Sequence, residues 1–357
     1  MMQATQPLNH ARSEAPQAGA ASLGKLEALC DDFDRICQSA SRHAEPDEVF
    51  LADKQDELWK LTKCICAEID VQEKSPDLHD QLREFQIVHF RQKVLRWYRT
   101  NQEFDRLWTK PAGYSGDYHT VELLCQSEPP LERFEDVFLN HLVKCTMASQ
   151  HWNKVLAHTK FLLRVLEKSN NNPVRILDAG CGPSHDVREA TRWLQHDCVG
   201  EIVLVDLDPQ ALRFSKGKLR NARHGIQFTY MQGDVLKTVR KFIQQGEAGT
   251  FDAILFGGLF DYISDRILRL LLKQSRHLLK GNGEMLFSQV STHNPDRTFM
   301  KWFGDWKLIE RDEEDLLNLC RDAEFADEQV LMWRERSKCA ILCHVANHGA
   351  PQHHGQS

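Results

Sequence analysis

The stretch Ile176-Leu-Asp-Ala-Gly-Cys-Gly-Pro-Ser184 decides the fold, because it joins a short apolar run to a helical segment. Residues 174–177 predict a buried strand, and two glycines follow it. Glycine lets the backbone approach a ligand that side chains would exclude, and Ser184 can cap the next helix. A Gly-x-Gly turn alone is equally typical of a merely tight turn, so its interpretation depends on the sequence around it.

Beyond Pro173 the pattern predicts a parallel sheet, because short apolar runs alternate with helical segments. The expected parallel strands are residues 174–177, 202–205, 226–230, 253–256 and 284–287. Residues 329–333 and 340–345 are separated only by a charged turn, which predicts an antiparallel hairpin at the sheet edge. We therefore expect an α/β fold with a seven-stranded, Rossmann-like sheet behind an all-helical N-terminal region.

The first half of the chain has helical periodicity. Apolar residues recur at helical spacing over residues 23–107, which predicts three helices, and again over residues 131–167. Between them, residues 110–118 hold one proline, two glycines and two tyrosines, and form either a connector with aromatic anchors or part of a site. We expect four parts: a disordered tail (1–22), a helical cap or lid region (23–172), the sheet domain (173–346) and a second disordered tail (347–357).

Composition excludes several classes of protein. A length of 357 residues predicts roughly two domains. A formal net charge of -6 argues against a general nucleic-acid binder, and the sequence has no apolar run long enough to span a bilayer. The opening residues lack the apolar segment of a secretory signal, so we expect a cytoplasmic protein. The eleven cysteines are odd in number and lack zinc-finger spacing, so we expect reduced thiols and no metal.

Acidic residues follow the second and third expected strands. Asp206 ends the second strand, where a carboxylate can accept hydrogen bonds from both hydroxyls of a ribose. Gly233-Asp234-Val235 follows the third strand and places a carboxylate beside an apolar wall, as an adenine ring requires. Each acid could be a solvated strand end, but their order and spacing after Asp178 together favour a nucleoside site.

Residues 173–346 resemble the class I S-adenosylmethionine-dependent methyltransferases in the glycine-rich loop, the two acids and the closing hairpin. A nicotinamide-binding protein would place a third glycine where this chain has Ser184. The resemblance implies S-adenosylmethionine as the cofactor. The residues implied to bind it in this domain are Asp178, Gly180, Gly182, Asp206, Leu207, Asp234, Val235 and Gly257.

Three further motifs resemble a narrower group. They are Lys-Pro-x-Gly-Tyr-x-Gly-Asp-Tyr (110–118), Gly-Leu-Phe-Asp-Tyr (258–262) and Asp-Trp-x-Leu-Ile (305–309). Over residues 82–346 the chain resembles the bacterial 3-hydroxy fatty acid methyl ester synthases, which make quorum-sensing signals. This resemblance implies an O-methyltransferase that converts 3-hydroxypalmitate or 3-hydroxymyristate to its methyl ester. Transfer to an oxygen, nitrogen or carbon of another metabolite stays open, as does a non-enzymatic cofactor-binding scaffold.

On this interpretation residues 110–118 form a lid. Tyr114 and Tyr118 would contact the cofactor or the acceptor, Asp117 would bind the cofactor amine, and Tyr262 would lie near the transferred methyl. The candidates for holding an acyl carboxylate are His293, Arg297 and Arg311, since arginine suits bidentate contact. Trp302 and Trp306 would line an acyl tunnel.

Each of these candidates has a structural alternative. The alternatives are a polar loop for His293 and Arg297, a surface charge for Arg311, and an aromatic core for the two tryptophans. The expected partner is a small amphiphilic acid, with no nucleic acid and no integral membrane contact. A homodimer through the N-terminal helices is a further expectation.

Overall fold

The computed structural model describes residues 15–126, 128–168, 172–222 and 225–347. The chain divides into two compact units. The first comprises Met1–Gln102 with Pro130–Leu139, and the second comprises Glu103–Pro129 with Asn140–Ser357. This division differs from the predicted boundary at residue 173, because α8 (Thr146–Glu167) buries Phe161 and Leu162 in the same core as the sheet residues Ile176 and Leu204.

The first unit is helical, as predicted. It contains α1 (Ala15–Ala40), α2 (Glu48–Glu73), η1 (Pro76–Leu78) and a continuous rod of α3 (His79–Phe85), η2 (Gln86–Leu95) and α4 (Arg96–Tyr98). Its core includes Tyr98, whose ring centroid lies 6.0 Å from that of Phe33 and 4.9 Å from that of Phe138. The buried Tyr98 hydroxyl is satisfied by Thr62 at 2.8 Å. Pairing of two chains through these helices stays a prediction.

Of the two predicted tails, the structure describes only residues 15–22 and Asn347. α1 begins at Ala15, so residues 15–22 are helical rather than disordered. Asn347 is anchored, since its N–H donates to the Gly283 carbonyl at 2.9 Å. Residues 1–14 and 348–357 lie outside the described residues.

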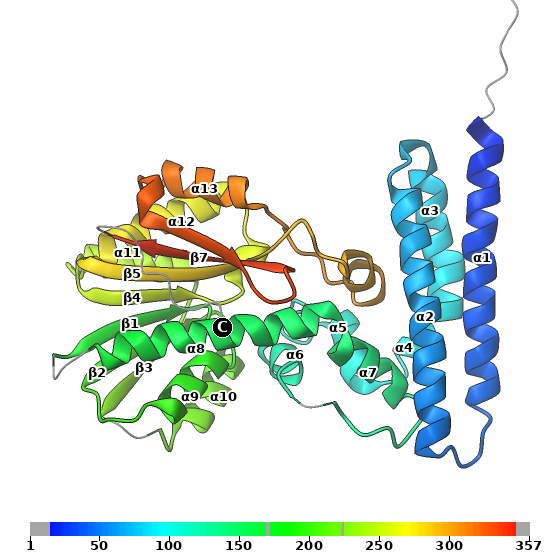
Figure 1. Cartoon of the computed structure of the whole chain (residues 1–357), viewed down its shortest axis with the longest axis horizontal. Helices are drawn as coiled ribbons and strands as arrows, with labels where there is room; N and C mark the ends of the chain where they lie inside the picture. The colour runs from blue at the N-terminus through cyan, green and yellow to red at the C-terminus, as the bar shows by residue number, and fades with distance from the viewer. Residues whose placement is uncertain (1–14, 127, 169–171, 223–224, 348–357) are drawn as a thin grey trace, which may run out of the picture. The chain divides into compact units, whose positions relative to one another are not determined.

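The second unit contains the seven-stranded sheet that the sequence predicts. Its strands are β1 (Val174–Ala179), β2 (Gly200–Asp206), β3 (Ile226–Gln232), β4 (Phe251–Phe256), β5 (Leu279–Val290), β6 (Val330–Arg334) and β7 (Ala340–Ala346). The order across the sheet is β3-β2-β1-β4-β5-β7-β6. β1 to β5 pair in parallel, whereas β7 is antiparallel to both β5 and β6 (Figure 1). The α/β fold and its antiparallel hairpin are therefore confirmed.

Helices cover both faces of the sheet (Figure 1). One core lies under α11 (Val235–Gln244), α12 (Asp265–Leu278) and α13 (Glu313–Asp322). The other lies under α8, α9 (His185–Trp193) and α10 (Pro209–Leu219). The remaining elements of this unit are α5 (Gln102–Thr109), α6 (Tyr118–Leu123), η3 (Leu259–Tyr262), η4 (Phe299–Phe303) and η5 (Asp327–Gln329), and α7 (Asp136–Lys144) runs into it from the first unit.

The segment of residues 103–129 is tied to the sheet unit by ion pairs. Lys110 reaches Asp305 at 2.5 Å, ahead of α6. Farther along, Glu122 on α6 accepts hydrogen bonds from Arg188 on α9 at 2.8 to 3.1 Å. Since these contacts lie within one unit, residues 110–118, called the Gly-Tyr loop below, belong structurally to the sheet rather than to the N-terminal helices.

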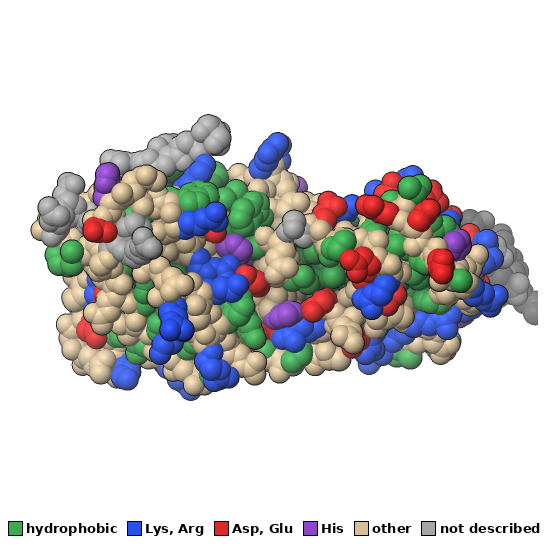
Figure 2. Space-filling model, turned by 90° about the horizontal axis from the view of Figure 1, so that it is seen from below, with side chains coloured by type: hydrophobic (Ala, Val, Ile, Leu, Met, Phe, Trp, Pro, Cys, Tyr) green, Lys and Arg blue, Asp and Glu red, His purple; other side chains and the backbone are tan. Residues whose placement is uncertain are grey.

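The face in Figure 2 carries Lys and Arg side chains together with acidic and hydrophobic ones. All eleven cysteines are free thiols. Among the described residues, no helix has the length and apolar character to cross a membrane.

A partly buried charge network joins α8 to the sheet and gives a test of the fold. Glu284 on β5 accepts hydrogen bonds from Arg164 at 2.7 Å and contacts His344 on β7 at 2.6 Å. Burial opposes ionisation of this carboxyl, but the bonds to His344 and Arg164 hold the pKa of Glu284 well below its usual value. The network therefore stabilises the fold above the unfolded-state pKa and loses this effect as pH falls.

We expect Glu284→Gln to lower the free energy of unfolding by about 2 kcal/mol near neutral pH, because charged hydrogen bonds are lost. The difference in free energy of unfolding between the variant and the native chain should narrow as pH falls below 4.5, the ordinary pKa of a glutamate carboxyl. Urea unfolding at neutral and acidic pH measures both effects. Glu313→Gln, which removes the more exposed pair with Arg334, is the matched control and should cost about 1 kcal/mol or less. Equal losses for the two variants would contradict the assignment.

Candidate active site

A cavity of about 360 Å³ opens at the carboxyl ends of the parallel strands. The chain order reverses between β1 and β4, so the loops after these strands diverge and leave a crevice between them. The loops after β1, β2, β3 and β4 supply one part of the lining. The rest comes from α6 and the loop before it, from α8, and from the segment before Arg311, with further contributions from α9 and β5. Every lining residue belongs to the second unit.

The loop after β1 is shaped by its glycines. Gly180 and Gly182 have φ angles of +73° and +50°, in the left-handed region that glycine favours. A Cβ on Gly180 would lie 3.3 Å from the Leu259 side chain, whereas a Cβ on Gly182 would meet nothing within 4 Å. The backbone at Gly182 therefore borders open cavity. Ser184 also has a positive φ, 51°, and makes no capping hydrogen bond, so its predicted role as a cap is wrong.

Asp206 holds the glycine loop and faces the cavity. Its Oδ2 accepts the Gly182 N–H at 2.8 Å, and its Oδ1 accepts the Asp208 N–H at 2.8 Å. Burial raises the pKa of Asp206, while these backbone bonds oppose the rise. Asp234 also lines the cavity, where it begins α11 by accepting the Lys237 N–H at 2.9 Å.

Eight of the ten predicted cofactor contacts line the cavity. They are Tyr114, Gly180, Gly182, Asp206, Leu207, Asp234, Val235 and Gly257. Asp117 does not line the cavity. Its carboxylate caps the N-terminus of α6 by accepting the Thr120 N–H at 2.9 Å, and it also pairs with Arg106 at 2.6 Å. Asp178 does not line it either, but its buried Oδ2 has no hydrogen-bond partner, and burial raises its pKa.

Tyr114 and Tyr262 meet at the cavity wall with ring centroids 6.3 Å apart and nearly perpendicular planes. The Trp306 indole N–H donates to the Tyr262 hydroxyl at 2.8 Å, which leaves the hydroxyl hydrogen free for another acceptor. Desolvation by the surrounding protein raises the pKa of Tyr262, although 39% of the residue is exposed. Tyr114, Tyr262 and Trp306 thus belong to one site, and the third predicted tyrosine, Tyr118, also lines the cavity. Trp302 is buried outside the cavity.

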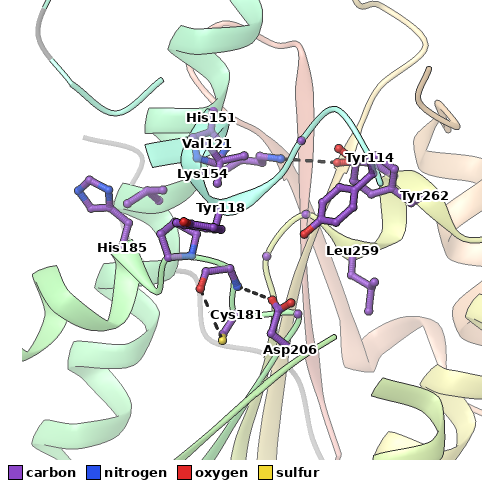
Figure 3. A pocket seen from close by; sticks show the side chains of 18 of the residues that line it. Tyr114, Tyr118, Val121, His151, Lys154, Cys181, His185, Asp206, Leu259 and Tyr262 are labelled. Carbon is purple, nitrogen blue, oxygen red and sulfur yellow. Dashed lines mark hydrogen bonds and ion pairs between the residues drawn. The ribbon is translucent and has the colours of Figure 1, made fainter. Parts of the chain in front are cut away.

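A polar face of α8 forms a part of the lining that sequence analysis missed. Gln150, Lys154 and His158 are spaced four residues apart, so they lie along one side of the helix, and His151 lies next to them. Figure 3 shows the Lys154 side chain extended from the helix, with its ion pair drawn as a dashed line. The only sequence signal for this face is the four-residue spacing itself.

Lys154 and Asp261 form a buried ion pair in the cavity wall. Their charged atoms lie 3.7 Å apart, and the side chains are 5% and 4% exposed. Asp261 Oδ1 accepts hydrogen bonds from Gln289 at 2.8 Å and from the Val290 N–H at 2.7 Å. Burial raises the pKa of Asp261, and Lys154 opposes the rise. Burial and the Lys154 charge lower the pKa of His151 to about 3, so its imidazole is neutral at neutral pH.

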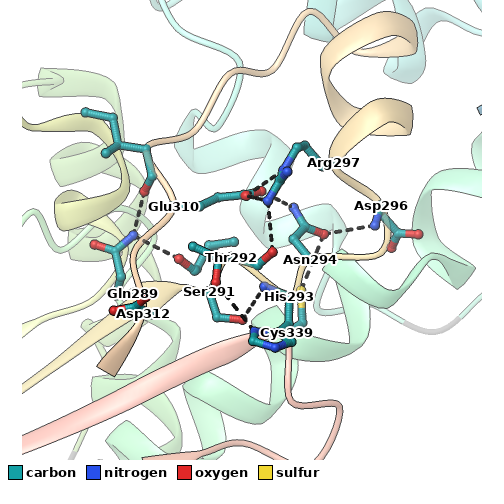
Figure 4. Close-up of polar contacts among 12 residues, drawn as sticks. Gln289, Ser291, Thr292, His293, Asn294, Asp296, Arg297, Glu310, Asp312 and Cys339 are labelled. Carbon is teal, nitrogen blue, oxygen red and sulfur yellow. Dashed lines mark hydrogen bonds and ion pairs between the residues drawn. The ribbon is translucent and has the colours of Figure 1, made fainter. Parts of the chain in front are cut away.

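His293 and Arg297, predicted to hold an acyl carboxylate, lie in an exposed polar loop after β5 and do not line the cavity (Figure 4). The His293 N–H donates to Ser291 at 3.2 Å, and Arg297 donates to Glu310 at 2.6 Å and to the Thr292 carbonyl at 2.9 Å. The structural alternative, a polar loop, is therefore the better description of these two residues, because the hydrogen bonds above tie the loop together and join it to Glu310.

Arg311 is also absent from the cavity lining, and it is neither a surface charge nor free to hold a substrate. It is 2% exposed, and its guanidinium donates to the carbonyls of Phe260 and Ile263, to Gln289 and to Asp265, at 2.6 to 2.9 Å. These bonds hold the segment that carries Asp261 and Tyr262. Arg311 therefore positions cavity-lining residues without itself lining the cavity.

Comparison with known families agrees with this arrangement. Residues 176–283, from β1 into β5, match the model of a methyltransferase domain family. The chain contains a class I S-adenosylmethionine-dependent methyltransferase domain. No curated protein sequence matches the chain.

Solved structures resemble the methyltransferase at low identity. A possible exported protein from Bordetella parapertussis is 14% identical, with a TM-score of 0.51 over 94% of this chain and 99% of that one, which shows a shared fold. The CurJ carbon methyltransferase is 14% identical, with a TM-score of 0.48 over 94% of each chain. Magnesium protoporphyrin IX methyltransferase from Synechocystis is 12% identical, with a TM-score of 0.43 over 56% of this chain and 86% of that one.

Asp206→Ala should weaken binding of S-adenosylhomocysteine about 10- to 100-fold, because a buried carboxylate that accepts hydrogen bonds is removed. Asp206→Asn keeps one acceptor oxygen and should lose less. Isothermal titration calorimetry measures the dissociation constants, and thermal unfolding confirms that each variant is folded. Unchanged affinity in both folded variants would exclude Asp206 from the cofactor site of the methyltransferase.

Gly116→Ala should disrupt the tyrosine wall, because the new Cβ would collide with the Tyr262 hydroxyl and lie 2.7 Å from the Trp306 ring. We expect kcat/KM to fall at least about 10-fold, as displaced site groups typically cost. Gly217→Ala on α10 is the matched control, since its Cβ would meet nothing within 4 Å and alanine favours helices. Equal activity of the two variants would show that close packing at Gly116 is unimportant for the reaction.

Proposed function

We propose that this methyltransferase transfers the methyl group of S-adenosylmethionine to an oxygen of a small amphiphilic acid. The first acceptors to test are 3-hydroxypalmitate and 3-hydroxymyristate, whose methyl esters are quorum-sensing signals in the family that the sequence resembles. The observation that carries the proposal is the two-ended cavity. One end has the glycine loop, Asp206 and Asp234, and the rest of the lining combines apolar side chains with the polar face of α8. The apolar side chains include Val121, Leu124, Met147, Val155 and Leu308.

The first end has the donors and acceptors that the cofactor needs. We assign Asp206 to the ribose hydroxyls and Asp234 to the adenine amine, with Leu207 and Val235 against the ring. Gly180 and Gly182 leave room for the backbone beside the methionine end, as the open space over Gly182 supports. The unpartnered oxygen of Asp178 and the engaged carboxylate of Asp117 favour Asp178 over Asp117 as the residue that balances the cofactor amine.

The second end orients the acceptor and excludes water. When bound, the cofactor supplies an electrophilic sulfonium methyl, so the protein needs chiefly to align the nucleophile and remove its hydration. We assign Tyr262, held by Trp306, to donate its free hydroxyl hydrogen to the acceptor. Tyr114 closes the same wall from the lid.

Purified full-length protein, isotopically labelled S-adenosylmethionine and 3-hydroxy acids from dodecanoate to octadecanoate test the proposal. We expect labelled methyl esters, identified by mass spectrometry, with a strongly reduced yield from Asp206→Ala. Absence of ester from every acid, while S-adenosylhomocysteine still binds, would contradict the proposed acceptor class. Label incorporated from a cell extract into an amine or a carbon atom would then identify the alternative.

A further inference from the structure

The end of the cavity formed by α8 holds polar groups that the protein itself leaves unsatisfied. Gln150 and His158 are each 2% exposed, yet Gln150 Oε1 and His158 Nε2 have no hydrogen-bond partner. His158 is held from its other nitrogen, because Nδ1 lies 3.3 Å from Asp186 on α9. A buried polar atom without a partner is costly unless a ligand or water supplies one. Two such atoms on one cavity-lining face therefore indicate a polar ligand group.

Lys154 lies between these two residues on the same face. A lysine side chain has three N–H donors. Among the described residues, Lys154 Nζ pairs with Asp261 Oδ2 at 3.7 Å. That distance exceeds a hydrogen bond, while Asp261 is already bound by Gln289 and the Val290 N–H. The Lys154 side chain is thus buried and has donors available for a further ligand. It is also the sole Lys or Arg among the residues that line the cavity.

Apolar side chains lie beside Lys154 in the cavity lining together with the polar face of α8, and they favour an anion attached to an apolar body. Met147 and Val155 lie on the same face of α8, and Val121 and Leu124 face it from α6 and its C-terminal end. A highly charged ligand would leave its additional charges unpaired among these side chains, which is costly. A single carboxylate attached to a hydrocarbon chain matches this wall.

We propose that Lys154 binds the carboxylate of the acceptor while Gln150, one helical turn away on α8, binds a hydroxyl on the same molecule. The inference rests on the methyl transfer proposed above. A hydroxyl can donate a hydrogen bond to the unpartnered Gln150 amide oxygen. The ion pair places the ammonium beside Asp261, the neighbour of Tyr262, after β4.

This arrangement requires no general base. A carboxylate oxygen attacks the sulfonium methyl, a C–O bond forms, and the C–S bond breaks with its electron pair left on sulfur. The products are a neutral ester and a neutral thioether, and no proton is transferred. Lys154 therefore remains an ammonium throughout, binds the charged acceptor and loses that attraction once the ester has formed.

Binding to the full-length protein saturated with S-adenosylhomocysteine tests the inference without turnover. The probes are 3-hydroxyhexadecanoate and its neutral isostere, 3-hydroxyhexadecanamide, measured by titration calorimetry. We expect Lys154→Met to weaken binding of the acid about 10- to 100-fold while leaving the amide within about 2-fold, because a charged hydrogen bond is lost. Lys154→Arg should restore part of the acid affinity. Lys160→Met, which removes an exposed lysine from the same helix, should change neither.

A second pair of measurements tests the hydroxyl subsite. Gln150→Met should remove the preference of the protein for 3-hydroxyhexadecanoate over hexadecanoate, with little effect on hexadecanoate itself. If both acids weaken equally in a folded Gln150→Met variant, the hydroxyl part of the inference is wrong.

The remaining outcomes separate this inference from the proposed function. A native protein that binds acid and amide equally, or a Lys154→Met variant that weakens both equally, overturns the role of Lys154. Formation of labelled ester by the native protein, with an unchanged acid preference in Lys154→Met, overturns the inference alone. Tight acid binding without ester formation contradicts the proposed function instead. If Lys154→Met does not fold, Lys154→Met/Asp261→Asn removes both buried charges and replaces it in the same comparison.

Discussion

The reversal of strand order between β1 and β4 is the constraint on which the site depends. From β1 the chain proceeds to β2 and β3 on one side, and β4 and β5 continue on the other. The loops after β1 and β4 consequently part, and the cavity lies at that separation. The predicted nucleoside residues lie over β1 to β3, where Asp206 ends β2 and Asp234 follows β3. The acceptor half is built beside β4, where Asp261 and Tyr262 follow Gly257. One topological feature therefore separates the two chemical tasks.

The lid segment shows how a fold completes its site with residues distant in sequence. Tyr114 lies far ahead of β1 in the chain, but Lys110 is tied to Asp305, and Glu122 to Arg188. These ion pairs hold Tyr114 against Tyr262, and the packing leaves no room for a side chain at residue 116. The helical half of the chain is consequently divided: the Gly-Tyr segment belongs to the methyltransferase unit, and the helices before it form their own core.

Most residues predicted to bind the cofactor line the cavity, whereas His293, Arg297 and Arg311, predicted to hold the acceptor, do not, and the difference has a physical reason. The glycine loop and Asp206 act through their own backbone geometry and strand position, both of which a local pattern reveals. Arg311, by contrast, is an arginine whose donors are satisfied by carbonyls from another segment, and no local pattern reveals that burial. Lys154, unlike Arg311, lines the cavity although the sequence analysis does not predict it. Its helix reads as amphipathic, and only tertiary packing turns the polar side toward the cavity.

The charges around the cavity suit the proposed transfer to an anion. The nucleoside half is acidic through Asp206 and Asp234, which suits hydroxyl and amine donors, and the acceptor half pairs one ammonium with one carboxylate. Bringing a carboxylate to a sulfonium joins opposite charges in a desolvated space, where their attraction exceeds that in water. Transfer neutralises both partners, so the attraction that assembles the complex disappears from the products.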